Sequence, residues 1–202
     1  MKIYLAGPDV FLPNAHARGA ELKALCIAHG AVGLFPLDNE LTDHVAGSIS
    51  HAHAIRAANM ELIGRSDAIL ANMTPFRGPS MDVGTAYEMG AGAALGKVVV
   101  GYTLDGGKSY PEKVKKWAGD DALERGKDGM LREDKGAGMF VEEFCDDDVG
   151  LVDNLMMSCG IEKLCFSEED AIKAIVEVLR GRKADNVAGT GGESVKRGGS
   201  GA

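Results

Sequence analysis

The chain has few cysteines and no long apolar run. Its 4 cysteines show no CxxC spacing, and no secretion signal precedes them, because the start MKIYLAGP becomes polar too soon. They are therefore expected to be reduced thiols rather than a disulfide framework. No apolar stretch is long enough to span a bilayer, so we expect no membrane segment. Together these absences favour a cytoplasmic location.

Positive charge and phosphate-binding motifs are also scarce. The chain carries 22 Lys and Arg against 30 Asp and Glu, a net charge of −8, which argues against nucleic-acid and anionic-membrane partners. Neither a G-x-G-x-x-G motif nor a P-loop occurs, so the phosphate cradles of dinucleotide and nucleoside-triphosphate sites are missing. We expect no cofactor, and an uncharged or weakly charged small molecule is the better substrate class.

Short apolar runs alternate with stretches of helical periodicity. The runs typical of buried strands lie at residues 2–7, 31–36, 67–73 and 97–103. Helical segments lie at residues 13–29, 51–64, 81–95 and 167–182. This alternation predicts an α/β fold, a flavodoxin-like or Rossmann-like parallel sheet of about five strands with helices on both faces.

Residues 1–182 are expected to form a single domain that includes one unusual stretch. Residues 104–150 are charged, glycine-dotted and weakly periodic, with a short helix around Trp117, and we interpret them as an excursion from the domain. The last helix is well marked, with Ser167 as N-cap and acids in its first turn. Residues 183–202 have the composition of a flexible C-terminal tail.

Polar and turn residues follow the predicted strands. In an open parallel sheet, ligands bind at the carboxyl ends of the strands. The segment after the first strand contains Gly7 and Phe11, and the segment after the second contains Asp38. We predict that these residues contact the substrate, although anchoring of its own loop explains Phe11 equally well.

The segment MDVGTAYEMG, residues 81–90, holds two acids of interest. Asp82 either complements the positive end of a helix or contacts a ligand, and its position fits both roles. The helical neighbours of Glu88 at three and four positions are all small: Gly84, Thr85, Ala91 and Gly92. Since each glycine weakens a helix by roughly 1 kcal/mol, close packing against a sheet or a ligand is the expected compensation. A carboxylate in such a narrow site can be the nucleophile of a retaining glycosyl transfer.

Three histidines and one arginine are further candidates for a functional role. His44, His51 and His53 suggest a metal site, but His51 and His53 lie two apart, so a helix would direct them to different faces. We therefore expect no metal. Arg77, in the loop after the third strand, is either a surface charge or a substrate contact.

Five segments occur in a fixed order over most of residues 2–160. They are KIYLAGP with Tyr4, FPLDNE at 35–40, D-x-G-T-x-x-E-x-G at 82–90, GKVVV at 96–100 and NLMMSCG at 154–160. Their ordered combination resembles the nucleoside 2-deoxyribosyltransferase family, and it is more specific than any one segment alone.

The resemblance implies an enzyme that exchanges nucleobases on a 2-deoxyribosyl group through a covalent intermediate. It implies that Glu88 is the nucleophile, that the Tyr4 hydroxyl orients it and that Asp82 contacts the substrate. Asn154 and Met156 match residues that, in family oligomers, reach into the site of a neighbouring subunit. The implied substrates are deoxynucleosides and free nucleobases. The implied active unit is a homo-oligomer whose sites are completed by a neighbouring subunit.

Two departures from the family pattern affect the expected chemistry. A family aspartate implicated at the base aligns with Asn59, whose amide can hydrogen-bond a base but cannot protonate it. Protonation of the leaving base then falls to Asp82, to water or to the base itself. Family members also often end near the site, whereas this chain continues through residues 183–202.

Two alternative functions stay open at the level of sequence. A related hydrolase, a deoxynucleoside or deoxynucleotide N-glycosidase, uses the same kind of glutamate. An enzyme of this kind that acts on nucleotides would need basic and serine residues after the first strand to bind the phosphate, and the segment GPDVFLPNA has neither Arg nor Ser. The other alternative is a non-catalytic module that binds a nucleobase or a protein partner, and its ligand binding would not depend on Glu88.

Overall fold

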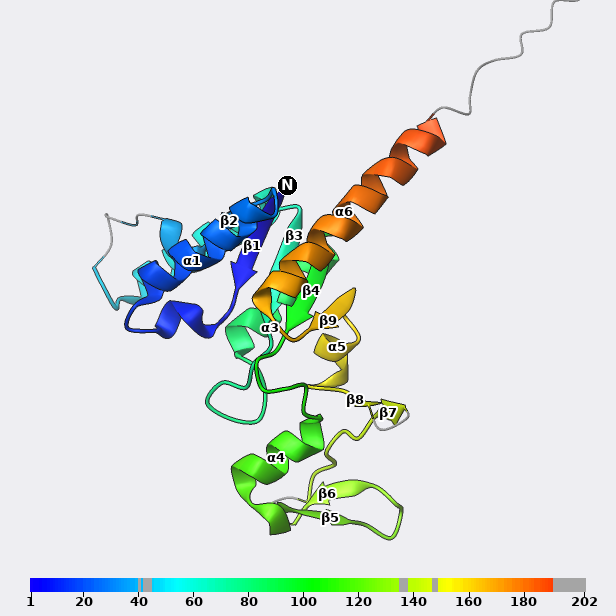
Figure 1. Cartoon of the computed structure of the whole chain (residues 1–202). Helices are drawn as coiled ribbons and strands as arrows, with labels where there is room; N and C mark the ends of the chain where they lie inside the picture. The colour runs from blue at the N-terminus through cyan, green and yellow to red at the C-terminus, as the bar shows by residue number, and fades with distance from the viewer. Residues whose placement is uncertain (40, 42–44, 135–137, 147–148, 191–202) are drawn as a thin grey trace, which may run out of the picture.

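The computed structural model describes residues 1–39, 41, 45–134, 138–146 and 149–190, and Figure 1 shows how their elements are arranged. Five short strands form one sheet, in which every neighbouring pair is parallel. In chain order they are β1 (Lys2–Ala6), β2 (Val32–Leu34), β3 (Ala68–Asn72), β4 (Val98–Tyr102) and β9 (Lys163–Cys165). Their spatial order is β2-β1-β3-β4-β9. The predicted α/β, flavodoxin-like fold with a five-stranded parallel sheet is confirmed.

Helices cover both faces of the sheet (Figure 1). They are α1 (Ala15–Ala28) and α6 (Glu168–Thr190) on one face, and α2 (Ile49–Arg65) and α3 (Val83–Ala94) on the other. Successive side chains of β1 enter opposite cores, with Ile3 and Leu5 on the α1 side and Tyr4 and Ala6 on the α2 side. This alternation brings Tyr4 into the layer that holds α2 and α3. None of the described helices is both long and apolar enough to cross a membrane.

The ends of the helices follow local sequence signals. Ser48 caps α2 by accepting a hydrogen bond from the backbone N–H of His51 at 3.1 Å. Asp82 caps α3 by accepting one from the backbone N–H of Thr85 at 2.9 Å. Gly30 follows α1 with φ at 76°, a left-handed backbone that glycine adopts without a steric cost. The observed bounds of α2 and α3 therefore agree closely with the helical segments predicted at 51–64 and 81–95.

Two parts of the chain differ from the sequence expectation. Periodicity locates four strands, and the fifth, β9, is a three-residue segment in which only Cys165 is buried, too short to show a period. The last helix does not end at Arg182 but continues to Thr190, so residues 183–190 are helical rather than part of a flexible tail. A helix can extend past its packed part because each added residue forms one more backbone hydrogen bond. The remainder of the predicted tail, residues 191–202, lies outside the described residues.

The described residues between 104 and 150 form small elements beyond the carboxyl edge of the sheet (Figure 1). They comprise α4 (Tyr110–Ala118), β5 (Leu123–Arg125), β6 (Leu131–Glu133), β7 (Cys145–Asp146) and β8 (Val149–Gly150). The helix α4 is the one predicted around Trp117, whereas the two antiparallel pairs, β5–β6 and β7–β8, were not predicted. A four-residue helix, α5 (Leu155–Ser158), follows, and three 3-10 turns complete the fold, η1 (Pro8–Phe11), η2 (Pro36–Asp38) and η3 (Asp120–Ala122).

Candidate active site

The candidate site is built around the carboxylate of Glu88, on α3. The hydroxyl of Tyr4, from β1, donates a hydrogen bond to Glu88 Oε1 at 2.5 Å. Because Tyr4 is fully buried, the core fixes its ring, and its hydroxyl holds the carboxylate in one orientation. Burial, and then the neighbouring charge of Glu88, raise the pKa of Tyr4 above its ordinary value, so the phenol stays protonated and remains a donor.

The Glu88 carboxylate titrates near neutral pH. Burial raises its pKa from the ordinary 4.5 to about 7. The hydrogen bond from Tyr4 acts in the opposite direction, and the negative charge of Asp82 adds a further rise. A partly buried carboxyl with a pKa near the working pH is typical of catalytic nucleophiles and bases.

A pocket of about 410 Å³ adjoins Glu88, between α2 and α3. Its wall is mostly apolar and is formed by Ala52, Ile55, Arg56, Asn59, Met60 and Ile63 of α2 and by Gly84, Tyr87 and Glu88 of α3. The volume suits a small organic ligand, and a few polar groups in an apolar wall are the usual composition of such sites. Glu88 is therefore an ionisable group in a small-molecule pocket and not a surface charge.

Asn59 lies in the wall of the same pocket, as a substrate contact would. Its Oδ1 atom is buried and has no hydrogen-bond partner among the described residues. An unsatisfied buried polar atom costs about 1–3 kcal/mol. A hydrogen-bond donor on a ligand in the pocket would remove this cost. The structure thus brings two of the predicted site residues, Asn59 and Glu88, into one pocket.

Two residues of the pocket wall were missed at the level of sequence. Arg56 donates a hydrogen bond to the Tyr87 hydroxyl at 2.8 Å, and its guanidinium carbon lies 5.7 Å from the centre of the Tyr87 ring. Arg56 could have been found, because it precedes Asn59 by three positions on one helical face. Tyr87 could not, because helical periodicity does not place neighbours in sequence such as Tyr87 and Glu88 on the same wall.

The small residues around Glu88 serve two purposes. Gly84 lines the pocket. Gly92 instead lies against the sheet, where an added Cβ would be 2.5 Å from Ile69 Cγ1. Both explanations left open by the sequence, a narrow site and tight packing on the sheet, thus apply at different positions.

Asp82 has a clear local role at the start of α3. Its Oδ2 accepts hydrogen bonds from both the backbone N–H and the hydroxyl of Thr85, at 2.9 and 3.1 Å. It does not line the Glu88 pocket, and it acts on Glu88 through its charge. Its role as a substrate contact stays a prediction.

Gly7 and Asp38 are engaged in local packing. An added Cβ at Gly7 would lie 2.9 Å from Asn72 Cβ, so the glycine permits close approach of β3. Asp38 accepts hydrogen bonds from Lys23 Nζ at 2.5 Å and from the backbone N–H of Phe35 at 3.0 Å. Neither lines the Glu88 pocket, so their contacts with substrate stay predictions.

Phe11 belongs to an aromatic cluster in the loops. Its ring stacks on that of Phe76 with centroids 5.4 Å apart. Arg77 lies over both rings, at 5.1 Å from Phe11 and 4.6 Å from Phe76, and is the one non-glycine residue with positive φ in the described chain. Phe11 is absent from the Glu88 pocket wall, and its contact with substrate also stays a prediction.

Asn154 and Met156 lie at the start of α5, outside the Glu88 pocket. The Oδ1 of Asn154 accepts a hydrogen bond from the backbone N–H of Met156 at 3.0 Å, and its Nδ2 donates one to Glu142 at 2.6 Å. The Met156 side chain is 74% exposed, so it can contact a second molecule. The role of both residues in a neighbouring site stays a prediction.

The described histidines do not belong to a cluster of possible metal ligands. Over the part of the chain that the structure describes, no group of three His, Cys, Asp or Glu could hold a metal ion. His51 and His53 lie on α2, and His44 lies outside the described residues.

Comparison with known proteins points to one family. The family model of nucleoside 2-deoxyribosyltransferase matches residues 3–156. The structure is similar to that of a 2-desoxiribosyltransferase from Leishmania mexicana, at 33% identity and a TM-score of 0.61, covering 87% of this chain and 97% of that one. A conserved protein from Enterococcus faecalis V583, at 22% identity and a TM-score of 0.55 over 88% and 98% of the two chains, supports the fold alone. An uncharacterized protein of Schizosaccharomyces pombe is 35% identical over 189 residues, 89% of each chain.

Proposed function

The chain belongs to the nucleoside 2-deoxyribosyltransferase family, and we propose that it transfers the 2-deoxyribosyl group between nucleobases with Glu88 as its nucleophile. The observation that carries this proposal is the Glu88 carboxylate, held by Tyr4 at the wall of an apolar pocket of small-molecule size. The family supplies the substrate class, deoxynucleosides and free nucleobases.

In the first half-reaction, Glu88 displaces the base of a deoxynucleoside. Tyr4 engages Oε1, so Oε2 is the oxygen that attacks the anomeric carbon C1′. The new C1′–O bond forms as the C1′–N bond breaks, and the base leaves with the bonding electrons. A 2-deoxy sugar favours this route, because no electron-withdrawing 2-hydroxyl destabilises the oxocarbenium-like transition state.

In the second half-reaction, a ring nitrogen of another base attacks C1′ of the glycosyl ester, the C1′–O bond to Glu88 breaks to release the carboxylate, and the proton of that nitrogen passes to solvent. Two displacements at one carbon retain its configuration. A carboxyl group with a pKa of about 7 is ionised enough at neutral pH to attack, and its anion is still a good enough leaving group for the second step. The raised pKa therefore serves both halves of the exchange.

The base is held by the α2 side of the pocket. Ile55 and Met60 supply apolar walls, and the unpaired Oδ1 of Asn59 accepts a hydrogen bond from a ring or exocyclic N–H of the base. An amide does not protonate a leaving group, so the proton on the departing base comes from water, from Asp82 or from the base itself. Arg56 and Tyr87, bonded to each other, form the outer edge of this wall.

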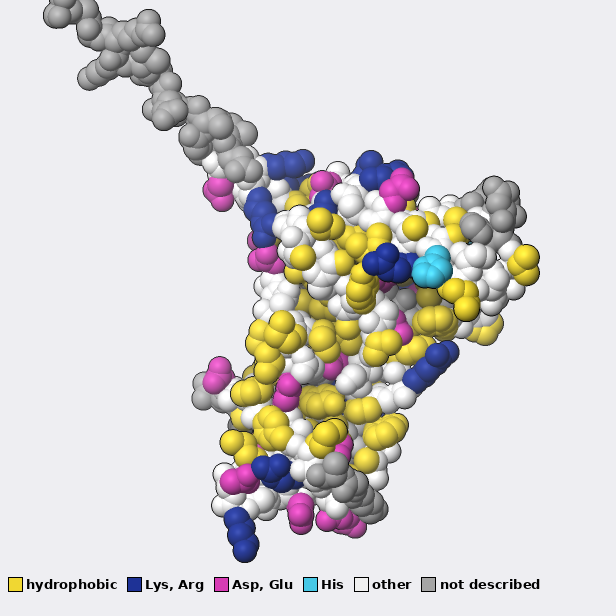
Figure 2. All heavy atoms as spheres, turned by 180° about the vertical axis from the view of Figure 1, so that it is seen from behind, with side chains coloured by type: hydrophobic (Ala, Val, Ile, Leu, Met, Phe, Trp, Pro, Cys, Tyr) yellow, Lys and Arg dark blue, Asp and Glu magenta, His cyan; other side chains and the backbone are white. Residues whose placement is uncertain are grey.

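Transfer rather than hydrolysis requires that water is kept from the ester, which a second subunit would achieve. Figure 2 shows hydrophobic side chains spread over the face opposite to that of Figure 1. Exposed large apolar residues of α2, α3 and the segments after β6 include Ile55, Val83, Tyr87, Phe144 and Met156. We propose that the neighbouring subunit packs against exposed apolar residues of α2 and α3, with its Asn154 and Met156 completing the Glu88 pocket.

An exchange assay tests the proposal. The protein is incubated with 2′-deoxyinosine and cytosine, and chromatography is used to detect 2′-deoxycytidine. We expect exchange by the wild type and by Glu177→Gln, an exposed control on α6, and none by Glu88→Gln. Release of hypoxanthine without a new nucleoside would favour the N-glycosidase. No reaction across several donor and acceptor pairs, with the fold intact by circular dichroism, would contradict both enzyme activities.

A further inference from the structure

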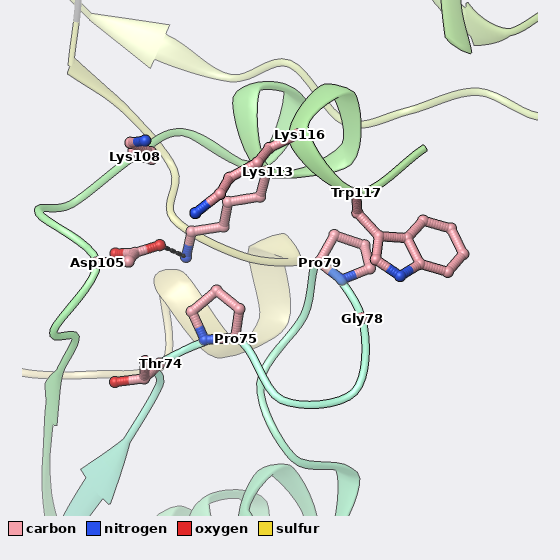
Figure 3. A pocket seen from close by; sticks show the side chains of 9 residues that line it. All are labelled: Thr74, Pro75, Gly78, Pro79, Asp105, Lys108, Lys113, Lys116 and Trp117. Atoms are coloured by element: carbon pink, nitrogen blue, oxygen red, sulfur yellow. Dashed lines mark ion pairs between the residues drawn. The ribbon is translucent and has the colours of Figure 1, made fainter. Parts of the chain in front are cut away.

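A second pocket, of about 360 Å³, lies at the carboxyl edge of the sheet (Figure 3). Its walls come from the loop after β3, from the loop after β4 and from α4. It shares no lining residue with the Glu88 pocket. This edge is where open parallel sheets bind ligands, yet the proposed deoxyribosyl transfer makes no use of the pocket.

The pocket is positively charged in a strongly acidic chain. Three lysines, Lys108, Lys113 and Lys116, and one carboxylate, Asp105, line it, whereas the chain as a whole has a net charge of −8. Lys108 and Lys116 are exposed, and within the described ranges neither lies at ion-pair distance from a carboxylate. Like charges gathered at one place repel each other. A bound anion would remove this repulsion.

Lys113, the buried lysine of the pocket, is held in place by two contacts. The Lys113 side chain is only 3% exposed, and its Nζ lies 3.2 Å from Asp105 Oδ2 and donates a hydrogen bond to the carbonyl oxygen of Val152 at 2.8 Å. These contacts use two of the three donors of an ammonium group, which leaves one for a ligand. Figure 3 shows the side chains of Lys113 and Lys116 extending from α4 towards the Asp105 side of the pocket.

Asp105 does not cancel the positive charge of the pocket. It is fixed by hydrogen bonds from the Thr103 hydroxyl at 2.7 Å and from the backbone N–H of Gly107 at 3.2 Å. Burial acts to raise the pKa of Asp105, but the Thr103 hydrogen bond and the charge of Lys113 outweigh it, so the pKa lies below its ordinary value. The ionised Asp105 thus balances Lys113. The charge of Lys108 also acts on Glu112, whose pKa it helps to lower.

An aromatic surface borders the lysines. Trp117 lines the pocket and is 66% exposed, and in Figure 3 its indole lies beside Pro79, away from Asp105. An exposed indole provides a flat face on which a planar ring can stack, and stacking of a nucleobase on an aromatic side chain contributes about 1–3 kcal/mol. The pocket therefore combines donors for an anion with a platform for a ring.

From this combination we infer that the pocket between α4 and the loop after β3 binds a nucleotide, with the phosphate at Lys108, Lys113 and Lys116 and the base on Trp117. The inference goes beyond the proposed transferase activity and does not depend on it, because the pocket shares no residue with the Glu88 site. No covalent step is involved.

The chain provides its own probe of occupancy. Trp117 is its 1 tryptophan, so tryptophan fluorescence reports on this pocket without a label. The protein is titrated with a nucleoside 5′-monophosphate, with the matching nucleoside and with inorganic phosphate, and absorbance by the ligand is corrected. We expect a saturable change with the monophosphate, at least roughly tenfold weaker binding of the nucleoside, competition by inorganic phosphate, and weakening by salt.

Matched variants locate the anion. Lys116→Gln and Lys108→Gln are each expected to weaken binding of the monophosphate roughly tenfold. Lys115 is exposed on the same helix but lies outside the pocket, so Lys115→Gln is expected to have no effect on binding. Lys113 is not substituted, because it also holds the carbonyl of Val152. Glu88→Gln is expected to leave the titration unchanged, which separates this site from the proposed catalytic one.

Four results would overturn the inference. The first is the absence of both a fluorescence change and a calorimetric heat on adding the monophosphate. The second is equal affinity for nucleoside and monophosphate. The third is a loss of the Trp117 signal in Glu88→Gln. The fourth is the same weakening of monophosphate binding in Lys115→Gln as in Lys116→Gln.

Discussion

Replacing Glu88 with glutamine removes a desolvated charge and keeps an oxygen that can accept the hydrogen bond from Tyr4. Because the pKa of Glu88 is raised on folding, from 4.5 to about 7, its ionisation favours the unfolded state. The stability that its protonated form contributes is fully present below about pH 4.5 and is lost progressively as pH rises to about 7. Glu88→Gln avoids this loss.

The size of the effect follows from the pKa change. A rise of this size corresponds to about 3 kcal/mol at full effect, and we reduce it to about 1–2 kcal/mol because water in the pocket partly screens the carboxylate. We therefore expect the free energy of unfolding of Glu88→Gln to exceed that of the wild type by about 1–2 kcal/mol at pH 8.5. At about pH 4, the two proteins are expected to be equal within error.

Urea unfolding followed by circular dichroism at both pH values measures this difference. Glu177→Gln removes a carboxylate from an exposed position of α6 and is expected to show no such pH dependence. The same Glu88→Gln protein is expected to be inactive in base exchange. A variant whose stability difference from the wild type is the same at both pH values would contradict the desolvation of Glu88.

Three further predictions concern the same region. In the wild type, kcat/KM should rise with pH through about 7. Tyr4→Phe removes the hydrogen bond that lowers the pKa of Glu88, so its kcat/KM is expected to rise at higher pH and to reach a lower plateau. An unchanged pH profile would contradict this expectation. Asp82→Asn keeps a capping oxygen but removes the charge that raises the pKa of Glu88, so the profile is expected to move to lower pH, and a move to higher pH would count against the assignment. Gly92→Ala puts a methyl group 2.5 Å from a sheet side chain and should lower the free energy of unfolding by about 1–3 kcal/mol. Its control Gly90→Ala, with nothing within 4 Å, should raise it by up to about 1 kcal/mol, and equal effects in urea would contradict tight packing of α3 on β3.

Most of the fold could be predicted because its signals are local. The strands β1, β3 and β4 are apolar runs with turn residues beside them, and α2 and α3 begin at the caps Ser48 and Asp82. The strand β9 gave no signal because its three residues include only one that is buried. Its place at the sheet edge is set by pairing with β4, which no local pattern encodes.

The site was predictable in part for the same reason. Tyr4 and Glu88 are 84 positions apart, so spacing could not pair them, and they were linked only through the family resemblance. The rule that ligands bind at strand ends pointed to Gly7 and Asp38, but the Glu88 pocket opens between α2 and α3, and these residues pack locally instead. The Arg56 contact with its partner on α3 depends on how two helices meet, which is a property of packing.

A search for the covalent intermediate tests the proposed role of Glu88 most directly. The protein is mixed with a deoxynucleoside without an acceptor base, quenched in acid, digested and analysed by mass spectrometry. We expect a deoxyribosyl adduct on the peptide that contains Glu88, lost on adding an acceptor base and absent from Glu88→Gln. Base exchange that persists in Glu88→Gln, or an adduct on a different residue, would contradict it.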